Sequence, residues 1–114
     1  MTYLSIGQRR VKENTVLDLV GDITIGEGAS ELSTAIRSLM ERGEFKILLN
    51  LADVDYVDSV GLGNLITSYT RLRKEGGELK LLNLSKNVLD ILVITKLVTV
   101  LDVFEDEAAA INSF

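Results

Sequence analysis

Two nearly continuous apolar segments, each followed by a helical pattern, place the strongest constraint on how this chain folds. The tetrapeptide Leu-Leu-Asn-Leu occurs at residues 48–51 and again at residues 81–84. Apolar runs of this length are typical of strands that are covered on both faces, as in parallel sheets. Two strand–helix units predict parallel strands joined by helical crossovers, whereas a solenoid would need at least three repeats. The sequence therefore predicts an α/β fold.

The other predicted elements agree with this fold class. Two strands at residues 3–10 and 15–20, joined by a polar turn at 12–14, form an opening hairpin. Helices are predicted at about 27–42, 59–75, 86–97 and 105–111, and strands at 45–51 and 79–84. The β-branched segment 98–101 predicts either a further short strand or an extension of the third helix. We expect a single domain over residues 1–114, with a mixed sheet of four to five strands and about four helices.

Composition excludes several classes of function. The chain has no cysteine, which removes disulfides, thiolate catalysis and cysteine-ligated metal sites. It has no histidine, which removes Ser-His-Asp catalysis, HExxH metalloprotease chemistry and phosphohistidine transfer. A formal net charge of −5 is the wrong sign for a protein that binds a phosphate backbone. We therefore expect no nucleic-acid contact and no cofactor.

The sequence also bears on where the protein resides. Its first residues show no basic stretch followed by an apolar one, as a signal peptide would. The most apolar segment, residues 88–104, is shorter than the ~20 residues that span a bilayer. Three charged residues also interrupt it, namely Asp90, Lys96 and Asp102. These features predict a cytoplasmic protein without membrane contact.

The most informative segment is the junction at residues 50–64, where a buried strand, a short acidic loop and a helix follow one another. Ligand sites in open α/β sheets concentrate at such carboxyl ends of strands. Asp58 and Ser59 are both good N-caps, so one of them is expected to cap the helix. The next N–H groups are then predicted to face solvent beside a hydroxyl; they belong to Val60, Gly61 and Leu62.

The glycines of this junction allow two interpretations. Gly61 and Gly63 have no Cβ, so a partner's surface could approach the backbone closely there. The simpler interpretation is that Asp-Ser only caps the helix and that the glycines let it pack against the sheet. Residue pattern alone leaves both open.

Several catalytic interpretations fail on chemistry. A serine nucleophile needs a base, and the adjacent carboxylates, with an ordinary pKa near ~4, are poor bases. Residues 21–28 have the glycine spacing of a P-loop, but Glu27 occupies the position of the phosphate-binding lysine. Asp53 and Asp55 imitate the paired carboxylates of haloacid-dehalogenase-type phosphatases, which need further acids and a much longer chain.

Residues 57–63, Val-Asp-Ser-Val-Gly-Leu-Gly, resemble the signature of the STAS domain, specifically that of bacterial anti-sigma factor antagonists. The resemblance extends over nearly the whole chain. It includes the segments Gly-Asp-Ile at 21–23, Leu-Asn-Leu at 49–51, Gly-Gly at 76–77 and Thr-Lys-Leu at 95–97. Thr24, Asn50 and Val60 depart from the residues that are usual in the family, and these departures bear on which partner is recognised.

This resemblance implies a binding protein without catalytic activity of its own. The unphosphorylated form would bind an anti-sigma factor that is also a serine kinase, and would thereby free a sigma factor. The kinase would phosphorylate Ser59, the helix N-terminus would accommodate the phosphate through its N–H groups, and a phosphatase would reset the switch. The resemblance implies a partner-contact set of Asp22, Thr24, Asp58, Ser59, Val60, Gly61, Leu62 and Gly63.

Alternatives remain at this point. A STAS module could instead serve a stress-signalling scaffold or a transport complex. A receiver domain phosphorylated on Asp53 or Asp55, with Lys96 as its lysine, fits the chain length but not the opening hairpin. A small hydrolase is the remaining enzymatic option. The protein is expected to be a monomer or weak dimer, and the apolar residues at 88–104 either complete the core or form a dimer contact.

Overall fold

The structure is a computed structural model that describes residues 4–26 and 28–114. The predicted first strand begins at Tyr3 and the predicted first helix at Glu27, and both of these positions lie outside the described residues. So does the P-loop comparison at Glu27.

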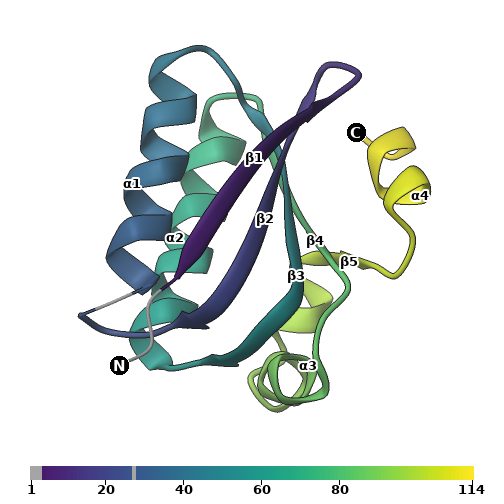
Figure 1. Cartoon of the computed structure of the whole chain (residues 1–114). Helices are drawn as coiled ribbons and strands as arrows, with labels where there is room; N and C mark the ends of the chain where they lie inside the picture. Colours follow the sequence, from purple (N-terminus) through teal and green to yellow (C-terminus); the bar gives the residue numbers. More distant parts are fainter. Residues whose placement is uncertain (1–3, 27) are drawn as a thin grey trace.

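A five-stranded mixed sheet forms the centre of the fold, with the strands in sequential order (Figure 1). Its strands are β1 (Ser5–Val11), β2 (Asn14–Ile23), β3 (Lys46–Val57), β4 (Glu78–Leu82) and β5 (Asp102–Phe104). β1 and β2 form the expected antiparallel hairpin, and β2 to β5 pair in parallel. The predicted fold class and sheet type are therefore confirmed.

Helices cover both faces of this sheet. They are α1 (Gly28–Glu41), α2 (Ser59–Lys74), α3 (Lys86–Ile94) and α4 (Glu107–Asn112), with a short 3-10 helix η1 (Leu97–Thr99). Figure 1 shows α1 and α2 side by side on one face and α4 on the other. In the described part of the chain, no helix is long and apolar enough to cross a membrane.

Two apolar cores result from this layering. The main core contains buried side chains from the sheet and from the helices α1, α2 and α3, such as Leu49, Ile36, Leu72 and Leu92. A smaller core lies under α4, where Ala110 and Ile111 pack against three strand residues, Val16, Leu48 and Leu82. Polar contacts also hold α4 in place, because the buried Lys80 donates to the Ser113 carbonyl at 3.0 Å and Arg9 forms an ion pair with Glu107.

Glycines end two helices as the sequence predicts. Gly43 and Gly76 adopt φ angles of +79° and +78°, in the left-handed region that glycine populates readily. The hairpin turn is tighter than expected. Asn14 already belongs to β2, and Lys12 has a φ of +56°.

The structure corrects two element predictions. The segment 52–57, expected as an acidic loop, continues β3 as far as Val57, because Val54 and Val57 are buried and pair with Gly21 and Ile23 of β2. Neither alternative predicted for 98–101, a short strand or an extension of the third helix, is correct, since η1 covers 97–99 and the next strand is β5 at 102–104. The third helix ends at Ile94, before Lys96 turns into the left-handed region.

Candidate functional site

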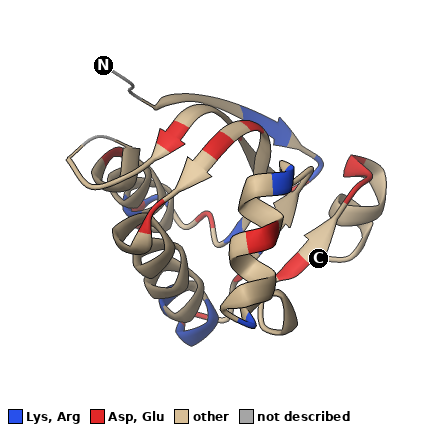
Figure 2. Ribbon diagram, turned by 90° about the horizontal axis from the view of Figure 1, so that it is seen from below, with Lys and Arg blue, Asp and Glu red and all other residues tan. Residues whose placement is uncertain are grey.

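The candidate site is the N-terminus of α2, at the carboxyl end of β3. Ser59 is the first residue of α2 and its side chain is exposed. Because β3 continues seven residues past its last pair with β4, this helix start lies beyond the end of β4, at the end of the molecule that Figure 2 shows from below. The hydroxyl is therefore accessible from solvent without unfolding of the chain.

Asp58 organises the surroundings of Ser59. Its Oδ1 accepts a hydrogen bond from the Gly61 N–H at 2.8 Å, which caps α2, and its Oδ2 accepts one from the Ile25 N–H at 2.9 Å. Its own N–H donates to the Ile23 carbonyl at 3.2 Å. One residue thus connects the end of β2, the loop that follows β2, and the first turn of α2.

Both carboxylate contacts favour the ionised form of Asp58. The N–H groups of Gly61 and, to a lesser degree, Ile25 hold the pKa of this carboxyl below its ordinary value of 3.8. Asp58 is therefore negatively charged at neutral pH, immediately before Ser59 in the chain.

This geometry corrects one prediction about the helix N-terminus. The N–H groups of Gly61 and Leu62 do not face solvent unpaired, because Gly61 donates to the Asp58 side chain and Leu62 donates to the Asp58 carbonyl at 2.9 Å. A cap that is an aspartate already supplies the negative charge that the helix dipole attracts. The N–H groups of Gly61 and Leu62 are therefore already paired and are not free to bind a phosphate on Ser59.

The two glycines of the junction differ in their surroundings. A Cβ on Gly61 would lie 2.1 Å from the Ile23 carbonyl oxygen, so only glycine lets α2 pack this closely against β2. A Cβ on Gly63 would meet no atom within 4 Å. The fold therefore explains Gly61 by internal packing and gives no structural reason for Gly63.

The other predicted contact residues lie around this helix start. Asp22 and Thr24 are half-buried at the end of β2, and the Thr24 carbonyl accepts a hydrogen bond from the Ala29 N–H at 3.0 Å. Val60 is exposed, whereas Leu62 is half-buried against the main core. The structure thus brings the predicted residues together from β2, its following loop and α2.

Sequence reasoning missed Ile25. This residue is 68% exposed in the loop between β2 and α1, and its backbone is bound to Asp58. The sequence signal was an apolar residue followed by a glycine, a residue typical of turns. In the structure Gly26 has a φ of +82°.

Acidic residues lie on the strands and at the start of α2 at this end of the molecule. Figure 2 shows red segments on the strands and at the start of α2, and blue segments at the far end of α2, where Arg71, Arg73 and Lys74 lie. Among the described residues, no group of three or more acidic, histidine or cysteine side chains is arranged to hold a metal ion.

A family model for the STAS domain matches residues 7–110. The chain belongs to the STAS domain family. The anti-sigma-B factor antagonist of Bacillus subtilis is 29% identical over 100 residues, which cover 88% of this chain and 90% of that protein. The family assigned from the residue pattern is confirmed.

Solved structures share the STAS fold of this chain. An anti-sigma factor antagonist from Mycobacterium paratuberculosis superimposes with a TM-score of 0.85 at 19% identity, covering 96% of this chain and 92% of that one. The phosphorylated form of the Bacillus cell fate determinant SpoIIAA gives 0.73 at 20% identity, with coverage of 96% and 98%. At these identities, the likeness shows the fold.

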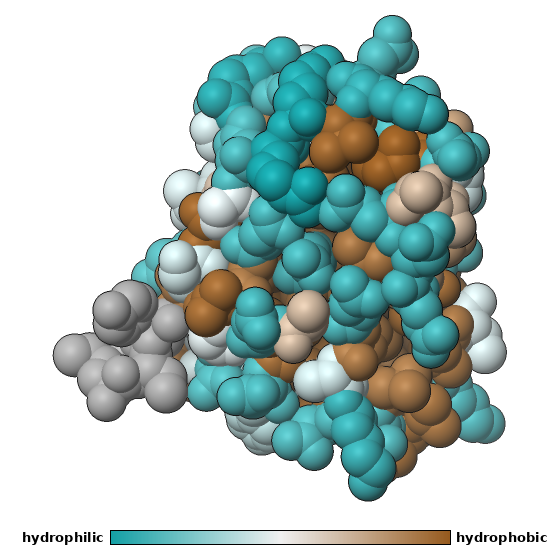
Figure 3. Space-filling model, turned by 45° about the vertical axis from the view of Figure 1, so that its right-hand side comes forward, coloured by the Kyte–Doolittle hydropathy of each residue, from teal (hydrophilic) through white to brown (hydrophobic). Residues whose placement is uncertain are grey.

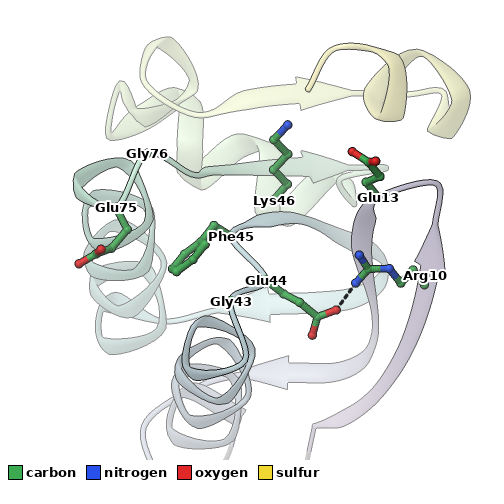
Figure 4. Close-up of a pocket in the computed structure, with 8 residues that line it drawn as sticks. All are labelled: Arg10, Glu13, Gly43, Glu44, Phe45, Lys46, Glu75 and Gly76. Atoms are coloured by element: carbon green, nitrogen blue, oxygen red, sulfur yellow. Dashed lines mark hydrogen bonds and ion pairs between the residues drawn. The ribbon is translucent and has the colours of Figure 1, made fainter.

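A surface hollow of about 400 Å³ lies at the other end of this STAS domain (Figure 4). It is lined by Arg10, Glu13, Gly43, Glu44, Phe45, Lys46, Glu75 and Gly76. Glu44 forms an ion pair with Arg10 across it. The hollow adjoins the end of α2 that is opposite Ser59, so it is separate from the candidate site.

The region 88–104 combines core and surface residues. Val88, Leu92 and Leu101 are buried, which supports the interpretation that this region completes the core. Other apolar side chains are exposed, namely Leu89, Val93, Ile94 and Val100. Figure 3 shows apolar side chains gathered in the lower part of the view, the end at which Figure 1 places α3.

Proposed function

We propose that this STAS domain is an anti-sigma factor antagonist whose binding is controlled by phosphorylation of Ser59. The unphosphorylated form binds an anti-sigma factor that is also a serine kinase, and a sigma factor is released. A phosphatase restores the binding form. The exposed hydroxyl at the start of α2, next to an ionised carboxylate, is the observation that carries this proposal.

The relatives support the same function. The Bacillus subtilis relative is named an anti-sigma-B factor antagonist, and the match covers most of both chains. The absence of cysteine and histidine from the sequence is in keeping with a binding protein rather than an enzyme. The proposed contact set is Asp22, Thr24, Asp58, Ser59, Val60, Gly61, Leu62 and Gly63.

Electrostatics gives the phosphoryl group a direct effect on binding. A phosphoserine adds about −1.5 to −2 charges at neutral pH. Asp58 precedes it in the chain, and its carboxylate already occupies the Gly61 N–H, so the added charge lies in an acidic setting. A partner surface fitted to a neutral hydroxyl would meet both repulsion and a desolvation cost. A loss of about 2.7 kcal/mol lowers affinity a hundredfold.

The fold itself should tolerate the phosphate. Ser59 is exposed, so the phosphoryl oxygens remain in water, and Asp58 still caps α2. The switch therefore acts on the complex rather than on the free protein.

Mass spectrometry after incubation with ATP and candidate anti-sigma factor kinases tests the proposal. We expect one phosphoryl group on the wild-type protein, mapped to Ser59, and none on Ser59→Ala. Ser30→Ala is a matched control, because Ser30 is also exposed near the start of a helix, and it should be modified normally. Modification of Ser59→Ala at the wild-type rate would refute the assignment.

Base stability of the modified protein separates the serine switch from a phosphoaspartate receiver, since phosphoserine survives mild base and phosphoaspartate does not.

Affinity capture from a bacterial lysate tests the alternative of a scaffold or transport module. A small ATP-binding kinase on the protein supports the proposed function, whereas large multi-chain assemblies would indicate a scaffold or transport module.

A further inference from the structure

We propose that Asp58 is a positioning residue that holds Ile25 next to the start of α2, so that the partner kinase binds the Ile25 side chain together with the Ser59 hydroxyl. This inference rests on the proposed function and adds an apolar contact to it. It also gives Asp58 a role distinct from that of a helix cap.

The loop that carries Ile25 is fastened at several points. Asp58 accepts the Ile25 N–H at 2.9 Å, and the neighbouring Thr24 carbonyl accepts the Ala29 N–H at 3.0 Å. Gly28 packs so tightly that a Cβ there would lie 2.0 Å from the Asp22 carbonyl oxygen. Described residues before and after Ile25 are therefore held by backbone contacts.

An exposed apolar side chain on an anchored backbone suits a docking surface. Binding costs less conformational entropy when the contacting backbone is already ordered, so the hydrogen bond at Ile25 favours association. Isolated exposed apolar residues are common and need no explanation by themselves. Ile25 differs because its backbone N–H donates to the Asp58 carboxylate. The other oxygen of this carboxylate caps α2, the helix that begins with Ser59.

Ile25 and the first turn of α2, which Asp58 connects, together present apolar and acidic groups. Val60, 39% exposed in the first turn of α2, adds a second apolar side chain. Asp58 binds the Ile25 N–H directly, and Asp22 lies three positions before Ile25 in the chain. An apolar centre with a polar rim is the usual anatomy of a protein-binding surface. The occupant is the kinase of the proposed function, because the same helix start carries its substrate hydroxyl.

Amide hydrogen exchange tests the positioning role without any partner. In Asp58→Asn, the side-chain oxygen can still cap α2 through Gly61, but the amide nitrogen cannot accept the Ile25 N–H. We expect exchange at Ile25 to accelerate at least about tenfold while Gly61 stays protected. Unchanged exchange at Ile25 would overturn the positioning role, whether or not a kinase modifies Ser59.

Calorimetry with the purified kinase that phosphorylates Ser59, without ATP, tests the contact. Ile25→Ala should weaken binding about tenfold or more, and the conservative Ile25→Val should restore affinity to within about threefold of wild type. Ile94→Ala is the matched control, because Ile94 is 79% exposed on α3, and its affinity should equal that of wild type. Wild-type affinity of Ile25→Ala, or an equal loss in Ile94→Ala, would overturn the proposed contact.

A double-mutant cycle links the two residues. If Asp58 acts through Ile25, Asp58→Asn weakens binding in the wild-type background but changes it by less than about twofold in the Ile25→Ala background. An equal loss in both backgrounds would show that Asp58 acts independently of Ile25. Failure of every kinase to modify Ser59 would refute the proposed function, and the exchange measurement would still decide the positioning role.

Discussion

At the scale of single residues, Gly61 and Gly63 lie two positions apart on α2, but substitution by alanine should have opposite effects on stability at the two positions. Gly61→Ala would force a Cβ to within 2.1 Å of a backbone oxygen, and overpacking of this kind costs roughly 1–3 kcal/mol or more. Gly63→Ala meets no neighbour and should raise the free energy of unfolding by roughly 0.5–1 kcal/mol through helix propensity. Urea unfolding of both variants measures the contrast, and equal stabilities would contradict it.

The Gly63→Ala variant also tests the proposed partner contact at Gly63. Because the fold has no need of glycine there, Gly63→Ala should give a more stable free protein that binds the kinase more weakly. Stabilisation together with unchanged affinity would remove Gly63 from the contact set.

The charge of Asp58 gives a pH-dependent contribution to stability. Its native pKa is lowered by the Gly61 and Ile25 N–H groups, so the contribution is present above the ordinary pKa of 3.8 and is lost as pH falls toward the native value. Asp58→Asn should therefore be less stable than wild type at neutral pH and should lose less stability on acidification. Parallel pH profiles from denaturant unfolding would contradict this.

The contacts at the candidate site could be predicted from the sequence only in part. The Asp-Ser pair marked the helix start, because both residues cap helices well. The second hydrogen bond of Asp58, to Ile25, joins residues 33 positions apart, and no local pattern encodes such a contact.

At the scale of elements, α4 and the main core should respond differently to the same substitution. Ile36 and Ile111 are both buried, Ile36 in the main core and Ile111 under the short helix α4. Ile36→Ala should lower the global free energy of unfolding by about 2–5 kcal/mol. Ile111→Ala should instead release α4 locally, because six helical residues can detach without unfolding the sheet.

Amide exchange distinguishes these outcomes. Ile111→Ala should speed exchange in α4 while β3 stays protected, whereas Ile36→Ala should speed exchange in both. Uniform acceleration across α4 and β3 in Ile111→Ala would show that α4 is part of the same cooperative unit.

The helices and strands could be predicted from the spacing of apolar residues, but several of their boundaries could not. β3 runs six residues past the predicted end at Leu51 because its paired partner β2 also extends, to Ile23. Pairing between strands is a tertiary contact that overrides the local acidic composition at Asp53 and Asp55. The predicted strand at 98–101 was also misplaced: residues 97–99 form the 3-10 helix η1, and the strand that pairs with β4 begins only at Asp102.

At the scale of the whole molecule, the sequence was sufficient for the fold class because two buried strand–helix units and an opening hairpin leave few topologies. The hairpin, the four-strand parallel part and the helix start at Ser59 agree with that prediction. The identity of the kinase was not predictable, since its binding surface belongs to another chain.

In the proposed switch, a phosphoryl group on Ser59 would add negative charge to a protein whose formal net charge is already −5. Ser59→Asp adds a single charge without the tetrahedral oxygens of a phosphate, so it should weaken binding only partly. The free protein should keep its fold in either form.

Release of the complex by ATP tests the central claim most directly. The complex with the kinase is purified, ATP and Mg²⁺ are added, and the fraction that stays bound is followed by size-exclusion chromatography. We expect the wild-type complex to dissociate as Ser59 is phosphorylated and the Ser59→Ala complex to persist. Equal release of the two proteins by ATP would contradict the account.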